Sequence, residues 1–172
     1  MSVGMSQSMV NELPRSLHAS ATPSLYTAAE RARRDATRWT LVQGLLAPVQ
    51  FLVFLVSVGL IARTLATGEG ADWALWSVVV KTFVLYLIMV TGAIWEKVVF
   101  GKYLFAPAFF WEDVVSMAVI ALHTAYLCAW LKGDAWLGLG GQLALALAAY
   151  ATYLVNAAQF VWKLRRARLE RA

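Results

Sequence analysis

The chain has 172 residues, of which 60% are hydrophobic and only 15% are charged. Domains that fold in water contain about 45–50% apolar and about 25% charged residues, so this composition excludes an ordinary soluble domain. The mean hydropathy is +0.62, and the hydrophobic residues are gathered in long runs. The composition therefore predicts an integral membrane protein.

The net charge of +5 comes from basic residues near the two ends of the chain. Arginines cluster between positions 31 and 38, and lysine and arginine recur between positions 163 and 171. No soluble domain is expected to present them to nucleic acid, so no nucleic-acid partner is predicted. Because Lys and Arg stay on the cytoplasmic side of a membrane, both termini are expected in the cytoplasm.

The first segment, residues 1–24, is polar and lacks the apolar core of a signal peptide, which predicts a disordered tail. Residues 26–38 are rich in arginine and predict an amphipathic helix on the membrane surface. Thr27 and Glu30 have the spacing of a capping box, which would start this helix.

Four hydrophobic runs follow within residues 25–172, at about 39–62, 73–95, 113–131 and 143–162. Each approaches the roughly 20 residues that a membrane span needs. A glycine-rich turn is expected at residues 138–141, before the last run. Four spans place both termini, and the connection from Glu96 to Asp113, on the same side. The sequence therefore predicts an all-α membrane protein built as a four-helix bundle.

Polar residues recur at helical spacing within these runs, so each span is expected to turn a polar stripe inward. Most of them are expected to hold helices together by hydrogen bonds. Lys81 is expected to extend to the outer interface, to pair with Asp72, or to have a functional role. The stripes contain Gln43, Gln50 and Ser57; Glu112, Ser116, Val119, His123 and Tyr126; and Asn156, Gln159 and Lys163.

The connection between the second and third runs has acids at both ends, Glu96 on one side and Glu112 and Asp113 on the other. Acids beside a bilayer are costly unless they are paired or used, so they are candidate functional residues. The alternative for Glu112 and Asp113 is that they cap the helix that they open. His123 falls near the middle of the membrane, where imidazole usually serves as a ligand or a proton carrier.

Several common site types are absent from the sequence. Cys128 is the only cysteine, so no intrachain disulfide and no thiolate metal site are predicted. There is no nucleophile elbow, no glycine-rich phosphate loop and no zinc-binding motif. A nucleotide-dependent or zinc-dependent enzyme is therefore not expected.

The segment FGKYLFAPAFFWED at residues 100–113 resembles the 2-vinyl bacteriochlorophyllide hydratases, membrane enzymes of bacteriochlorophyll synthesis. The resemblance extends from Tyr26 to about Arg168 and also includes residues 31–44, 47–57, 66–70, 94–97 and 122–127. It implies a hydro-lyase that adds water to the vinyl group of chlorophyllide a, or of a related vinyl chlorin, to give a 1-hydroxyethyl group. It also implies the inner or intracytoplasmic membrane of a phototrophic bacterium, where a second copy or other pigment-synthesis enzymes could be partners.

Such a reaction needs an acid, a water molecule and a base. No cofactor is expected, because the magnesium belongs to the chlorin substrate. Glu96 would end a helix, where the negative end of the helix dipole favours the protonated acid. Asp113 or Glu112 would open a helix, where a carboxylate stays ionised, so we expect Glu96 as the acid and one of these two as the base. Lys97 beside Glu96, or Lys102 beside Asp113, would weaken this assignment.

Substrate binding is expected from the same connection and from His123. As a neutral imidazole, His123 could ligate the chlorin magnesium; alternatively it could donate the proton, leaving the carboxylates as caps. Lys97, Lys102 or Lys81 could pair with the propionate of the pigment, and Lys102 is favoured because it is expected on the cytoplasmic side. Five aromatic residues could stack on the macrocycle or form an interfacial belt: Trp95, Phe105, Phe109, Phe110 and Trp111.

Two other classes of function compete with the enzyme. A non-catalytic carrier or assembly factor for chlorophyllide pigments would need His123 and the aromatic residues, but not the carboxylates. A proton or ion pathway could run along Lys81, His123 and Glu112, although four spans without an internal repeat do not favour one.

Overall fold

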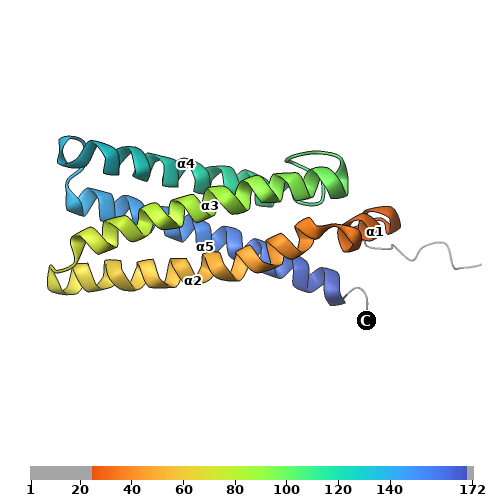
Figure 1. The fold of residues 1–172 in the computed structure, drawn as a ribbon, viewed down its shortest axis with the longest axis horizontal. Coiled ribbons are helices and arrows are strands. Elements are labelled where there is room, and N and C mark those ends of the chain that lie inside the picture. The colour runs from red at the N-terminus through yellow and green to blue at the C-terminus, as the bar shows by residue number, and fades with distance from the viewer. Residues whose placement is uncertain (1–24, 170–172) are drawn as a thin grey trace, which may run out of the picture.

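A computed structural model describes residues 25–169, apart from the side chain of residue 134. It contains five α-helices and one 3-10 helix, and no strand occurs within the described residues (Figure 1). In chain order these are α1 (Ala28–Ala36), α2 (Arg38–Thr67), α3 (Ala71–Phe100), α4 (Phe110–Lys132), η3 (Gly133–Ala135) and α5 (Leu139–Leu169). The tail predicted at residues 1–24 lies outside the described residues.

The four helices α2 to α5 are each long and apolar enough to cross a membrane. They cover the four predicted spans, which confirms an all-α architecture with four membrane-spanning helices. Each helix runs past the predicted span at both ends. The extension at the end of α3 adds more than one helical turn and places Glu96 within the helix.

The glycine-rich turn predicted at residues 138–141 is wrong in its position. Helix α5 begins at Leu139, so Gly140 and Gly141 lie in its first turn, and the connection is made by residues 133–138. A Cβ atom at Gly141 would lie 3.1 Å from Cδ2 of Leu137. The absence of a side chain therefore lets the helix start close against the preceding residues.

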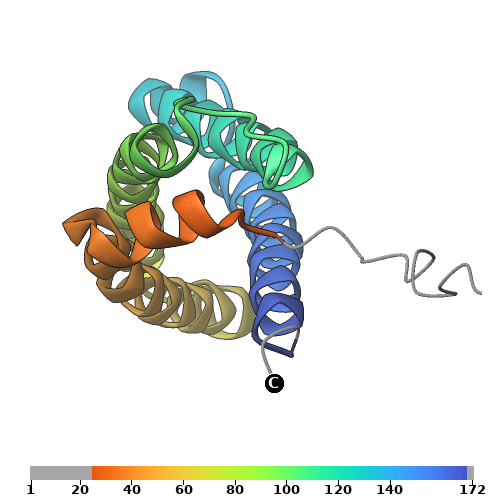
Figure 2. The same cartoon turned by 90° about the vertical axis from the view of Figure 1, so that its right-hand side faces the viewer.

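The four long helices surround a common axis, with α2 beside α3 and α4 beside α5 (Figure 2). Helix α1 lies across one end of this bundle. The connection at residues 101–109 and the last turns of α5 lie at the same end (Figure 1). We call this the α1 end. The orientation of the α1 end toward the cytoplasm stays a prediction.

The polar stripes face the interior, as predicted. Ser57 is wholly buried, and its Oγ lies 2.6 Å from Oγ of Ser77 and 2.5 Å from the hydroxyl of Tyr150. Gln43 donates from Nε2 to Oγ1 of Thr91 at 2.8 Å. These bonds connect α2 with α3 and α5, so polar groups inside the bundle hold its helices together.

Helix α1 begins with the predicted capping box. The Glu30 carboxylate accepts the N–H of Thr27 at 2.8 Å, and the Thr27 hydroxyl accepts the N–H of Glu30 at 3.3 Å. Nε of Arg33 donates to the carbonyl of Val99 at 2.8 Å, so α1 caps a free carbonyl in the last turn of α3. The location of α1 on a membrane surface stays a prediction.

Candidate active site

The connection at residues 101–109 folds back onto the α1 end of the bundle. Gly101 ends α3 with a left-handed φ of 80°, and Nζ of Lys97 donates to its carbonyl at 2.9 Å. Phe105 has a φ of 58°, the only positive φ of a non-glycine residue in the described chain. Such a conformation costs about 1–3 kcal/mol and persists only where its surroundings hold it, often at functional sites.

Two buried acids from α3 and α4 meet beneath this connection. Glu96 is 5% exposed and Asp113 is 4% exposed, and their carboxyl groups lie close enough to interact. The N–H of Phe105 donates to Oδ2 of Asp113 at 2.7 Å, and the N–H of Ala106 donates to Oε2 of Glu96 at 3.5 Å. Carboxylates only accept hydrogen bonds, so a bond between two carboxyl groups requires one proton. We call Glu96 and Asp113 the carboxyl pair.

Glu112, the third predicted acid, is held in a separate interaction. Its Oε2 accepts from Nζ of Lys163 at 2.5 Å, with the two side chains 7% and 25% exposed. Nζ of Lys163 also donates to the carbonyl of Ala108, and Nδ2 of Asn156 donates to the carbonyl of Glu112 at 2.9 Å. Glu112 therefore fixes the start of α4 against α5, which leaves Asp113 as the better candidate for the base.

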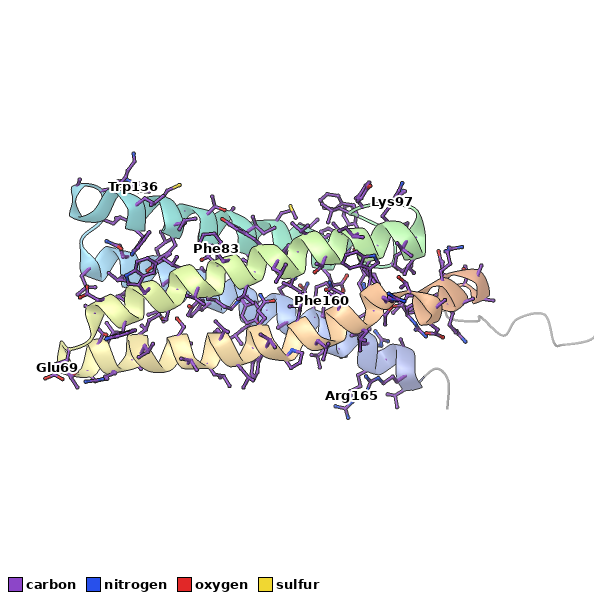
Figure 3. All side chains as sticks on the ribbon, viewed as in Figure 1. Glu69, Phe83, Lys97, Trp136, Phe160 and Arg165 are labelled. Carbon is purple, nitrogen blue, oxygen red and sulfur yellow. The ribbon has the colours of Figure 1, made fainter. Side chains whose placement is uncertain are left out.

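The lysines that could have neutralised the carboxyl pair do not do so. Lys97 is occupied by the carbonyl of Gly101, and Lys102 is exposed. Within residues 25–169, neither lysine forms an ion pair with Glu96 or Asp113. Figure 3 shows Lys97 at the α1 end, near the end of α3, and Glu69 at the opposite end of the bundle.

The five predicted aromatic residues divide into two groups. Phe109, which is 2% exposed, and Trp95 pack together at 5.7 Å in a core cluster with Tyr26, Phe100 and Phe160. These two stabilise the end of the bundle rather than offer a free ring face. The other three, Phe105, Phe110 and Trp111, are exposed by 38%, 43% and 68% and follow one another at 5.8 and 5.4 Å. This exposed group is the better candidate for stacking on a flat pigment.

His123 lies deeper in the bundle, ten residues and about 15 Å along α4 from Asp113. It is wholly buried beside the ring of Tyr150, and its Nδ1 lies 2.8 Å from the carbonyl of Val119.

Lys81 of α3 is also wholly buried, with Nζ 3.9 Å from the ring centroid of Tyr153. Lys81 therefore neither extends to the outer interface nor pairs with an acid, and those two expectations are wrong. The ring of Tyr153 contacts its ammonium group inside the bundle.

Within the described part of the chain, no group of three or more His, Cys, Asp or Glu side chains could hold a metal ion. His123 is the predicted ligand of the substrate's magnesium, and its Nε2 has no hydrogen-bond partner among the described residues. That arrangement leaves a lone pair available, but the side chain has no exposed surface. Magnesium ligation and the absence of a resident cofactor both stay predictions.

Comparison with known proteins identifies the family. The family model of the 2-vinyl bacteriochlorophyllide hydratases matches residues 26–166. The chain belongs to this family. A 2-vinyl bacteriochlorophyllide hydratase of Cereibacter sphaeroides is 68% identical over 146 residues, covering 85% of this chain and 89% of the relative. One of Rhodobacter capsulatus is 62% identical over 160 residues, covering 93% and 92%. No solved structure matches the chain.

Sequence reasoning missed two parts of this member of the hydratase family. The backbone N–H groups of Phe105 and Ala106 hold the carboxyl pair, and no side-chain pattern indicates them. The ion pair between Glu112 and Lys163 was also missed, although Asn156 and Lys163 share one side of α5 at a seven-residue spacing. That spacing marked the interior face of the helix but did not identify the acid that the lysine meets.

Proposed function

We propose that this protein is a hydro-lyase that adds water across the vinyl group of chlorophyllide a, giving the 1-hydroxyethyl chlorophyllide. The observation that carries the proposal is the carboxyl pair, two buried acids close enough to share one proton, next to exposed aromatic rings. The names of the two relatives support the reaction class. Their source organisms and the four apolar helices support a role in the cytoplasmic membrane of a phototrophic bacterium.

The two acids differ in their surroundings, and this difference supports a separate role for each. Asp113 lies in the first turn of α4, where the helix dipole favours a negative charge, and it accepts a short 2.7 Å bond from Phe105. Glu96 lies in the last turns of α3, where the dipole disfavours a negative charge, and its bond from Ala106 is long at 3.5 Å. We therefore assign the shared proton to Glu96 as general acid, and the base to Asp113.

The reaction then balances without any other group. Glu96 gives its proton to the terminal vinyl carbon, and the π-electron pair forms the new C–H bond. The macrocycle delocalises the cation left on the carbon beside the ring. The oxygen of a water molecule attacks that carbon, and Asp113 takes the proton that the water releases. Because the two carboxyl groups touch, the proton can return from Asp113 to Glu96, and the pair is ready for another turnover.

The pigment would bind at the α1 end. Phe105, Phe110 and Trp111 would stack on its macrocycle, and the exposed Lys102 would pair with its propionate. The magnesium is part of the pigment, and His123 would supply the axial ligand if the ring reaches the interior of the bundle. The α1 end would face the cytoplasm, because exposed arginines gather there.

Conversion of chlorophyllide a by membranes containing the full chain tests the proposal. Glu96→Gln and Asp113→Asn should each lower the rate about 100-fold or more, because each variant removes one proton-transfer group. Glu69→Gln is the matched control, since Glu69 is exposed at the opposite end of the bundle, and it should leave the rate unchanged. Near-normal turnover by Glu96→Gln would contradict the assignment of the acid. Pigment that is bound by the unmodified protein but returned unchanged would identify a carrier instead.

The role of His123 has its own test. His123→Ala should shift the absorption spectrum of bound pigment and weaken its affinity if imidazole ligates the magnesium. An unchanged spectrum and affinity, with normal amounts of folded protein, would exclude ligation.

A further inference from the structure

Two nitrogen atoms inside the bundle lack a hydrogen-bond partner among the described residues. They are Nζ of Lys81 on α3 and Nε2 of His123 on α4. Both side chains have a relative exposure of 0%. Burying a polar group without a hydrogen bond costs free energy, and burying a charged group costs more. The two atoms therefore indicate a ligand that the protein chain itself does not supply.

The chemistry of the two residues restricts the class of this ligand. Nδ1 of His123 lies 2.8 Å from the carbonyl oxygen of Val119, which can only accept, so Nδ1 carries the ring proton. In a neutral imidazole, Nε2 is then an acceptor. His123 and Lys81 contact Tyr150 and Tyr153, which lie about one turn apart on α5, so protonating Nε2 as well would bury a second positive charge in the same region. The ligand must therefore accept a hydrogen bond from Lys81 and donate one to His123.

Neither a simple anion nor a metal cation meets both requirements. An anion would accept from Lys81 but would face the lone pair of Nε2, and a cation would be repelled by the ammonium group. A hydroxyl-type oxygen accepts and donates at once. The smallest such ligand is water, and buried waters commonly satisfy polar groups that lack protein partners.

The neighbouring side chains do not replace this ligand. The ring of Tyr153 attracts the ammonium of Lys81 at 3.9 Å, but a ring face has no oxygen lone pair to accept its N–H groups. The hydroxyl of Tyr150 is engaged with Ser57 at 2.5 Å. The hydroxyl of Tyr126 donates to the carbonyl of Leu75 at 2.9 Å. Within the described structure, these two hydroxyl groups are therefore engaged with other partners.

We propose that Lys81 and His123 together bind a buried water molecule inside the membrane-spanning bundle. Lys81 donates to the water oxygen, and the water donates to Nε2 of His123. The bridge connects α3 to α4 through their interior faces. The site goes beyond the proposed function, because it lies about 15 Å along α4 from Asp113 and is occupied in the pigment-free protein; a magnesium ligated by Nε2 would displace the water.

The full chain contains two histidines, which allows a direct test. His18→Gln leaves His123 as the sole histidine, so ¹⁵N,¹³C-histidine labelling of this parent in lipid nanodiscs gives one imidazole signal. Magnetisation transfer from water to the carbon-bound protons of His123 should be observed. The ¹⁵N resonance of Nε2 should have the shift of a nitrogen that accepts a hydrogen bond.

Three lysine variants of the parent complete the experiment. Lys81→Met should abolish the water transfer and move the Nε2 resonance to that of a free lone pair. Lys81→Gln, which keeps an N–H donor, should retain both signals. Lys102→Met removes an exposed lysine and should change neither. A parent without water transfer to His123, or equal transfer in Lys81→Met, would overturn the proposal. If Lys81→Met fails to fold, the parent and Lys81→Gln still decide the question, and neither reading depends on hydratase activity.

Discussion

Lys163→Met tests how much the contacts of Lys163 at the α1 end contribute to the stability of the protein. Methionine keeps most of the apolar stem of lysine but removes its charge, so the change removes both the ion pair with Glu112 and the hydrogen bond to the carbonyl of Ala108. In the unmodified protein, Nζ of Lys163 lies 2.5 Å from Oε2 of Glu112, and the Glu112 side chain is only 7% exposed. The variant leaves this carboxylate buried without its counter-ion.

The expected loss follows from the burial of the two side chains. Removing one partner of a fully buried ion pair costs about 3–5 kcal/mol, because the remaining charge is uncompensated. Lys163 is 25% exposed, so water screens part of the interaction, and we expect about 3 kcal/mol. Lys163→Met combined with Glu112→Gln should recover part of this loss, since a neutral amide is less costly to leave unpaired.

The assay is the free energy of unfolding of the full chain in mixed detergent micelles, measured by the loss of helical circular dichroism. Arg63→Met is the matched control. Arg63 pairs with Glu69 at 3.3 Å, but these side chains are 59% and 73% exposed, so this change should cost about 0–1 kcal/mol. If Lys163→Met costs no more than Arg63→Met, burial does not govern the strength of these pairs and the reasoning fails.

Three smaller predictions use the same unfolding assay. Phe105→Gly should be about 1 kcal/mol more stable than Phe105→Ala, because glycine adopts a φ of 58° without strain and alanine does not. Equal stabilities of the two variants would show that the backbone at position 105 is not strained. Gly59→Ala should stabilise the protein by roughly 0.5–1 kcal/mol, because alanine favours a helix interior over glycine and a Cβ atom at position 59 of α2 would meet nothing within 4 Å. A lower free energy of unfolding in this variant would contradict the prediction. Tyr150→Phe and Ser57→Ala should each cost about 1 kcal/mol or more, and Ser57→Ala also loses the bond to Ser77. The double variant should cost less than the sum of the two, because both single variants break the same bond between Ser57 and Tyr150. Simple additivity would mean that these two hydroxyl groups do not interact.

The candidate site was predicted in part. The positions of Glu96 and Asp113 at the two ends of a short connection indicated that they could act together, because that connection limits how far apart they can lie. The aromatic residues were also found, but the sequence could not separate Phe109, which is in the core, from Phe110, which is exposed. Adjacent residues of a helix start point in different directions, and which of them faces inward depends on where α5 packs.

The local patterns of the sequence determined the four spans, their inward polar stripes and the start of α1. These features depend on hydrophobic run length, helical periodicity and the capping spacing of Thr27 and Glu30, which need no distant contacts. Only the tertiary structure decided that Lys163 meets Glu112, that Lys81 stays buried against Tyr153, and that the backbone of Phe105 holds Asp113. The reason is physical: each of these contacts joins residues from different helices or from a loop, so it depends on the register and rotation of packed helices, which no local pattern specifies.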